Sequence, residues 1–88
     1  MESVWVFNGI QPCFPSGVFT NRAQAESWIL LHKLTGTLTE YPLDIGMYEY
    51  SVEKKLFKPH KEEHWSSIFI GRFSGGGLNH FHYEDGQC

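Results

Sequence analysis

Hydrophobic and polar residues follow each other along this chain with periods that predict both strands and helices. A β-rich run at Val4–Phe7 ends at an Asn-Gly turn signal, and the short run Gly17–Phe19 can pair back on it. An alternating, β-branched run at Thr37–Tyr41 is stopped by Pro42. The segment 78–84 alternates again, and we expect it to close the fold as a strand.

The clearest helical pattern begins after an N-cap at Thr20 or Asn21 and is expected to end at Gly36. Alanine and glutamate favour a helix in this region. The apolar stripe consists of Ala25, Trp28, Ile29 and His32. We therefore expect Trp28 and Ile29 to lie in the core.

The middle of the chain carries weaker patterns. Gly46–Tyr50 is either a further strand or the entry to a short helix over 51–57, and 58–64 is a polar connection. A short amphipathic helix is predicted over 64–73, before the Ser-Gly-Gly-Gly stretch 74–77 breaks it. Its apolar side consists of Trp65, Phe69 and Phe73, four residues apart, with Ile68 beside them.

Together these elements predict a single small α+β domain over residues 1–88, in the order β-β-α-β-β-α-α-β. The sheet is expected to be mainly antiparallel and packed on one face by one longer helix and one or two short ones. Eighty-eight residues are too few for two separate hydrophobic cores.

The motifs VWVFNG, FPSGVF, AESWI, LTGTLTEYPLDIGMYEY, LFKP and HFHYEDG give the chain a resemblance to a family of small, stand-alone, uncharacterised bacterial proteins. The resemblance covers nearly the whole chain, and it implies the fold more than any function. In size, acidity and lack of catalytic motifs the chain is also similar to small immunity proteins that neutralise secreted bacterial toxins.

Composition and charge narrow the possible functions. The net charge of −3 argues against nucleic acid as a partner and favours a basic protein partner. No apolar run is long enough to span a membrane, and no signal peptide precedes the first strand, so we expect a cytoplasmic protein. The two cysteines, Cys13 and Cys88, form neither a metal knuckle nor a CxxC motif, and a disulfide between them stays open.

The histidines are the candidates for metal chemistry. In a strand, His80 and His82 point to one face, and His60 and His64 have the i, i+4 spacing of one helix side. A zinc site made only of histidines is uncommon among structural sites. The alternative is that Phe81 fills the core while His80 and His82 face solvent or a partner. We therefore expect no metal and no cofactor, with these four histidines as weak metal candidates.

Nucleophilic and phosphate-binding chemistry finds little support. Cys13 has apolar neighbours, which favours a buried thiol over a reactive one. Ser16 lacks the context of a nucleophile elbow and is typical of a turn. The glycine-rich stretch 74–77 lacks the Gly-Lys-Ser/Thr ending of a phosphate loop and is expected to be a hinge or helix terminator.

Tyrosines and carboxylates lie close together between residues 40 and 50. Pro42 and Gly46 are expected to hold this segment in a rigid turn, and rings flanked by acids are a common composition for a protein-binding surface. The predicted partner-binding residues are Glu40, Tyr41, Asp44, Tyr48, Glu49 and Tyr50. The alternative is that the tyrosines complete the core.

These observations predict a non-enzymatic protein-binding protein, most concretely an immunity-type inhibitor. It would neutralise a bacterial toxin or nuclease by occluding the basic active site of that partner. Two alternatives stay open: a small histidine-based, metal-dependent enzyme, and a structural or regulatory homo-oligomer built by pairing of the terminal strand.

Overall fold

A computed structural model describes residues 2–10, 14–74 and 77–88 of the chain. These residues form two compact units of an α+β fold. The first unit comprises the chain up to Leu43 together with Leu78–Cys88, and the second comprises Asp44–Gly77. Cys13 lies outside the described residues, as does the middle of the glycine-rich stretch, so the expectations for both stay predictions.

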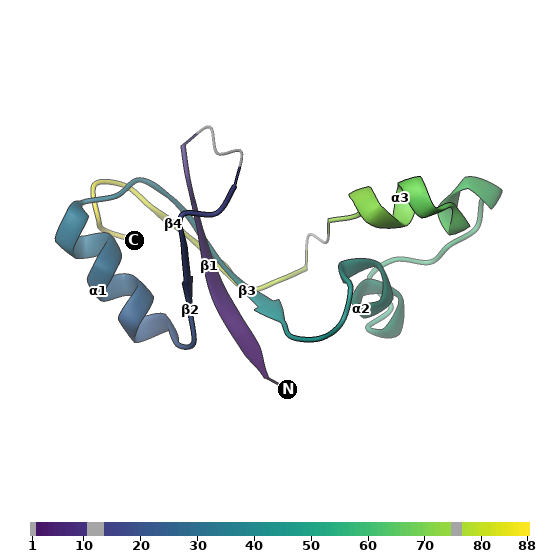
Figure 1. Cartoon of the computed structure of the whole chain (residues 1–88), viewed down its shortest axis with the longest axis horizontal. Helices are drawn as coiled ribbons and strands as arrows, with labels where there is room; N and C mark the ends of the chain where they lie inside the picture. The colour runs from purple at the N-terminus through teal and green to yellow at the C-terminus, as the bar shows by residue number, and fades with distance from the viewer. Residues whose placement is uncertain (1, 11–13, 75–76) are drawn as a thin grey trace. The chain divides into compact units, whose positions relative to one another are not determined.

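The first unit contains a four-stranded antiparallel sheet with the strand order β2-β1-β3-β4 (Figure 1). Its strands are β1 (Ser3–Gly9), β2 (Gly17–Phe19), β3 (Gly36–Pro42) and β4 (His80–Tyr83). The register places Val6 opposite both Val18 and Thr39, and Thr37 opposite His82. The four strands predicted in this unit are thereby confirmed, with small shifts at their ends.

Helix α1 (Arg22–His32) begins at Asn21, whose Oδ1 accepts the backbone N–H of Gln24 at 2.8 Å. The expectation that the helix runs to Gly36 is wrong. The helix stops at Lys33, which adopts a left-handed conformation with φ 51° and caps the last carbonyls with its N–H.

Gly36 has a different role, in β3. A Cβ atom built on it would lie 2.2 Å from the carbonyl oxygen of Asn8 and 2.7 Å from the ring of Phe7. Glycine is therefore required here because strand β1 and the ring of Phe7 approach the backbone too closely for any side chain.

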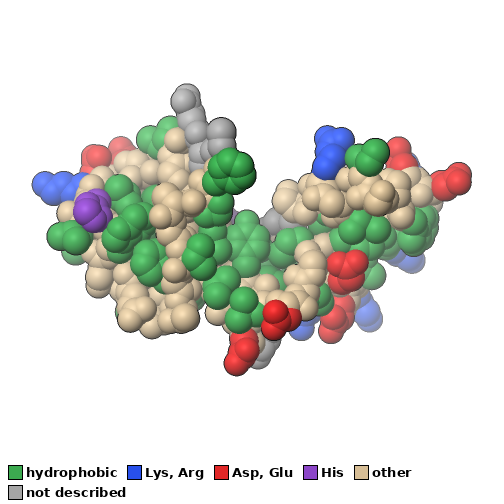
Figure 2. All heavy atoms as spheres, in the orientation of Figure 1, with side chains coloured by type: hydrophobic (Ala, Val, Ile, Leu, Met, Phe, Trp, Pro, Cys, Tyr) green, Lys and Arg blue, Asp and Glu red, His purple; other side chains and the backbone are tan. Residues whose placement is uncertain are grey.

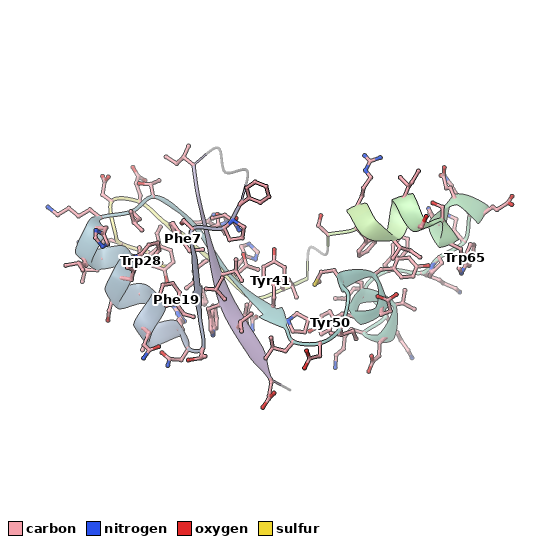
Figure 3. All side chains as sticks on the ribbon, viewed as in Figure 1. Phe7, Phe19, Trp28, Tyr41, Tyr50 and Trp65 are labelled. Atoms are coloured by element: carbon pink, nitrogen blue, oxygen red, sulfur yellow. The ribbon has the colours of Figure 1, made fainter. Side chains whose placement is uncertain are left out.

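The core of the first unit lies between α1 and one face of the sheet. Its buried residues are Phe7, Ala25, Ile29, Leu38 and Tyr83. Figure 3 shows the rings of Phe7, Phe19 and Trp28 gathered against α1. The predicted burial of Ile29 is confirmed, whereas Trp28 is half-buried and packs at the margin of the core, edge-on to Phe7 at 5.7 Å between ring centroids.

A tight turn follows β4 and contacts the end of α1. Glu84 and Gln87 exchange two backbone hydrogen bonds around Asp85 and Gly86, which have φ values of 51° and 87°. Positive φ at both central residues is typical of a hairpin turn of type I′. The N–H of Gly86 also donates to the carbonyl of Leu34 at 2.8 Å, so this turn is fixed on the connection between α1 and β3.

The second unit contains α2 (Met47–Glu53), a short 3₁₀ helix η1 (Glu62–Trp65) and α3 (Ser67–Arg72). Gly46–Tyr50 is therefore the start of a helix, and the predicted order contains one strand too many. The predicted helix over 51–57 is also too long, because the chain leaves α2 through Lys54 and turns at Lys55, where φ is 61°.

The helix predicted over 64–73 is divided at Ser66. This residue is extended, with ψ 151°, and its Oγ accepts the N–H of Phe69 at 3.1 Å as the N-cap of α3. The break changes which side chains share a face: Phe69 is half-buried, whereas Trp65 is 58% exposed and Ile68 is 71% exposed. The predicted apolar stripe is therefore wrong for these last two residues.

A cluster of aromatic side chains, three of them only half-buried, holds the second unit together. Its members are Tyr48, Phe57, His64, Phe69 and Phe73. Ring centroids in this cluster are between 4.7 Å apart, for His64 and Phe69, and 6.2 Å apart, for Tyr48 and Phe69. On the face seen in Figure 2, acidic and basic side chains are interspersed over this unit.

The position of Trp28 at the core margin leads to a stability prediction. Trp28→Ala removes the ring that contacts Phe7 and Phe19, and should lower the free energy of unfolding by about 3 kcal/mol. Leu31→Ala, on the same helix but 75% exposed, should change it by less than about 0.5 kcal/mol. Urea unfolding followed by circular dichroism measures both. Equal losses in the two variants would contradict the assigned helix face.

Candidate functional site

One face of the sheet is covered by α1, and the other face carries no helix of its own unit. Because side chains alternate along a strand, the residues opposite Phe7 and Leu38 point away from α1. They are Val4, Val6, Asn8, Val18, Thr37, Thr39, Tyr41, His80 and His82. In Figure 3, Tyr41 lies on the other side of the β1 ribbon from Phe7 and Trp28. We call these nine residues the open sheet face.

The open sheet face contains no lysine, arginine, aspartate or glutamate, although these four types make up 19% of the chain. Its valines, threonines and tyrosine have the composition of the centre of a protein interface, where charged residues are depleted and tyrosine is enriched. Val18, on the edge strand β2, is 63% exposed. The face can therefore contact another molecule without the desolvation of a full charge.

His80 and His82 lie side by side on this face, as predicted, with ring centroids 5.2 Å apart. His80 Nδ1 lies 2.9 Å from the carbonyl oxygen of Leu78, and His82 Nδ1 lies 3.3 Å from Thr37 Oγ1. A carbonyl oxygen only accepts, so Nδ1 of His80 carries the proton in this hydrogen bond. The lone pair of the neutral ring is then on Nε2.

The other histidine pair, His60 and His64, belongs to the second unit. In His64 the proton is on the other ring nitrogen than in His80. His64 is 8% exposed, and its Nδ1 accepts the backbone N–H groups of His60 at 3.2 Å and Lys61 at 3.3 Å. Nε2 of His64 therefore carries the proton of the neutral ring. His64 caps η1 and fills the aromatic cluster, while His60 is exposed.

The four histidines predicted as weak metal candidates thus lie as two pairs in two different units. Within residues 2–10, 14–74 and 77–88, no group of three or more His, Cys, Asp or Glu side chains could hold a metal ion.

The predicted tyrosine and carboxylate surface is distributed over both units. In the first unit, Glu40 and Tyr41 are neighbours in β3 and therefore point to opposite faces of the sheet. In the second unit, Asp44 and Glu49 are exposed, Tyr50 is half-buried and Tyr48 is buried in the aromatic cluster. Their role in partner binding stays a prediction.

Glu40 has a structural role that the sequence does not indicate. Its carboxylate accepts hydrogen bonds from Ser3 Oγ and, at 3.1 Å, from Asn79 Nδ2. The bond from Ser3, and then that from Asn79, lowers the pKa of Glu40 below its ordinary value. The side chain thereby connects the start of β1 with the residue before β4.

A second network connects β4 to α1. The hydroxyl of Tyr83 donates to Glu26 Oε2 at 2.6 Å, and Arg22 Nε lies 3.2 Å from the same oxygen. The guanidinium carbon of Arg22 lies 3.5 Å from the ring centroid of Phe81. The i, i+4 spacing of Arg22 and Glu26 was the one signal of this network in the sequence, since Tyr83 is 57 residues away from Glu26.

The fold and this site define a small α+β domain with one helix-covered and one open sheet face. The chain belongs to a family described as a domain of unknown function (DUF7710), whose model matches residues 4–88. This agrees with the resemblance of the sequence to an uncharacterised family of small proteins. No curated protein and no solved structure matches the chain.

In the described part of the chain, none of the helices has the length and apolar character needed to cross a membrane.

The environment of Tyr83 predicts that the protein loses stability at alkaline pH. Burial, and then the hydrogen bond to Glu26, raises the pKa of Tyr83 to about 12 from an ordinary value of 10.0. Because the folded-state pKa is the higher one, the contribution of neutral Tyr83 is complete below pH 10 and is lost as the pH rises through about 12. Urea unfolding between pH 8 and 12 should show this decline.

In Tyr83→Phe the decline should be weaker, since no hydroxyl is left to titrate. Tyr50→Phe, which removes a hydroxyl from the second unit, is the matched control and should keep the decline. An equally steep decline in Tyr83→Phe and the parent protein would contradict this assignment.

The environment of Tyr48 predicts how substitutions of this residue change the free energy of unfolding. Its ring packs in the aromatic cluster, but its buried hydroxyl finds no hydrogen-bond partner among the described residues. Tyr48→Phe should therefore leave the free energy of unfolding unchanged or raise it by about 1 kcal/mol. Tyr48→Ala should lower it by about 3 kcal/mol, because the ring is lost. A large destabilisation in Tyr48→Phe would show that the hydroxyl is bonded.

Proposed function

We propose that this chain is a non-enzymatic protein-binding domain that docks a partner protein on the open sheet face. The observation that supports the proposal most is the absence of charged side chains among the nine residues of this face, in a protein that is otherwise charged at its surface. Burial of β-branched and aromatic side chains gives affinity without unpaired charges.

Tyr41 is the expected anchor of the complex. It is half-buried in β3, opposite Val4, so its ring is already held by the sheet before a partner arrives. A ring that is fixed in advance loses little conformational entropy on docking. Thr39 and Val6 continue the same face beside it.

The charge of the chain supports a basic partner. The net charge is −3, and Glu2 and Glu84 are exposed next to the ends of β1 and β4, around the open sheet face. Carboxylates at the rim of an interface mainly accelerate association with a basic protein. Within this proposal, the narrower hypothesis is an immunity-type inhibitor that occludes the basic active site of a bacterial toxin or nuclease.

Self-association is a second candidate, and one observation favours it. The N–H of Glu40 donates to the carbonyl of Asn79, so the alternation of an antiparallel pair leaves His80 and His82 at positions that do not bond to β3. Their backbone N–H and C=O groups point to the free edge of the sheet, where a strand from a second copy can pair. Light scattering in solution distinguishes a dimer of this kind from a monomer.

Variants of the open sheet face test the docking proposal. A basic protein captured from the native organism should dissociate about 10-fold faster from Tyr41→Ala than from the parent chain, because the anchoring ring is lost. Leu31→Ala, which shortens an exposed side chain on α1, is the matched control and should bind like the parent. Surface plasmon resonance measures both rates.

The same measurement tests the predicted electrostatic steering. Glu2→Gln combined with Glu84→Gln removes the two exposed carboxylates next to the ends of β1 and β4. This variant should associate more slowly at low salt and depend less on salt. Capture that survives Tyr41→Ala without change would overturn docking on the open sheet face.

A further inference from the structure

We propose that His80 and His82 form a two-histidine chelate for a borderline divalent transition metal such as Zn²⁺, Ni²⁺ or Cu²⁺. Imidazole nitrogen suits these ions, whereas Mg²⁺ and Ca²⁺ prefer oxygen ligands. The site lies on the β4 side of the open sheet face, and its existence does not depend on the proposed docking function.

The spacing of the two rings fits one shared metal ion. A metal–nitrogen distance of about 2.0–2.1 Å places the metal about 3.2 Å from the ring centroid, so two rings at a tetrahedral angle have centroids about 5.2 Å apart. The centroids of His80 and His82 are 5.2 Å apart, with an angle of 88° between the ring planes. Both side chains are exposed, so a metal ion reaches them from solvent.

The protons are also in the places that a metal ligand requires. His80 Nδ1 donates to the carbonyl of Leu78, which leaves the lone pair of Nε2 for the metal. In His82 the lone pair of Nε2 is free in the same way when Nδ1 donates to Thr37 Oγ1, which can accept a hydrogen bond. Metal-binding histidines usually donate their second ring nitrogen to a carbonyl, carboxylate or water in this way, which orients the ring.

The histidine pair in the second unit, His60 and His64, lacks this arrangement of protons. His60 and His64 are even closer, with ring centroids 4.8 Å apart, and His60 Nδ1 also lies 3.1 Å from a carbonyl oxygen, that of Lys58. However, His64 Nδ1 accepts two backbone N–H groups, so its other nitrogen is protonated. This pair therefore offers one free lone pair, and the pair on β4 offers two.

Only two protein ligands are available at the proposed site within the described residues. Water fills the remaining coordination positions, so the ion exchanges readily and a chelator removes it without unfolding the protein. The bound ion adds positive charge to a face that otherwise carries no charged side chain.

The test is a titration with each metal alone, in a chain in which both cysteines are replaced by serine so that thiolates do not bind the ion. Isothermal calorimetry with Zn²⁺ or Ni²⁺ should show one saturable site, and the melting temperature should rise with metal concentration. His80→Gln and His82→Gln should each weaken binding by about 10-fold or more, because each removes one ligand directly.

Two further variants make the result specific. His60→Gln is the matched control, since it removes an exposed histidine that also bonds to a carbonyl, and metal binding should not change. Thr37→Val keeps the size of the side chain but removes the hydroxyl partner of His82, and should weaken binding by about 10-fold. Circular dichroism without metal checks that each variant folds like the parent chain.

The tautomers give a second, independent measurement. Long-range ¹H–¹⁵N spectra of the imidazoles at a pH where they are neutral should show the proton on Nδ1 in His80 and on Nε2 in His64. The proposal is overturned if the parent chain shows no saturable binding, if the glutamine variants on β4 bind like the parent, or if His60→Gln weakens binding as much as they do.

Discussion

A single helix of eleven residues has to cover a sheet of four strands in the first unit. The contact of α1 with Phe7 and Leu38 buries one face and leaves the second face without a helix of that unit. This one-sided burial is reflected in the middle of β1, where Trp5 and Phe7 are large and apolar, whereas Val4 and Val6 are smaller and β-branched. Such residues fit a half-buried sheet surface and require no charged partner.

Strand β4 shows how the edge of this sheet is held in place. It has only four residues, and one of its two edges has no neighbouring strand in the sheet, so its position depends on side-chain bonds as well as on the ladder with β3. Tyr83 bonds to Glu26 on α1, and Asn79 bonds to Glu40 on β3. These two contacts lie on the helix-covered side of the strand. The histidines on the other side are free from this structural task.

The sequence predicted the elements whose signals are local. The period of the apolar residues indicates α1, a β-rich run before an Asn-Gly turn indicates β1, and alternation indicates β3 and β4. The prediction that Gly36 ends the helix was wrong, since glycine is required at this position by the close approach of Asn8 in another strand. Trp65 was misplaced because a single extended residue, Ser66, changes which side chains share a helix face.

The candidate site was less predictable than the fold. Alternation placed His80 and His82 on a common face, but their tautomers depend on the carbonyl of Leu78 and the hydroxyl of Thr37. The carboxylate of Glu40 similarly accepts hydrogen bonds from Ser3 and Asn79, which are far from it in sequence. Spacing in the sequence therefore identifies candidate residues, whereas the distribution of protons follows from tertiary contacts.

The turn at Asp85-Gly86 has a consequence for the chemistry of the whole face. A slip of β4 by one residue against β3 would exchange the two sides of the strand, and would place His80 and His82 against α1 and Phe81 in solvent. The hydrogen bond from the N–H of Gly86 to Leu34 opposes such a slip. Glycine is needed at this close contact, because a Cβ on it would lie 3.0 Å from the Cα of Lys33. A glycine without any functional group of its own thus decides which side chains the protein presents to its surroundings.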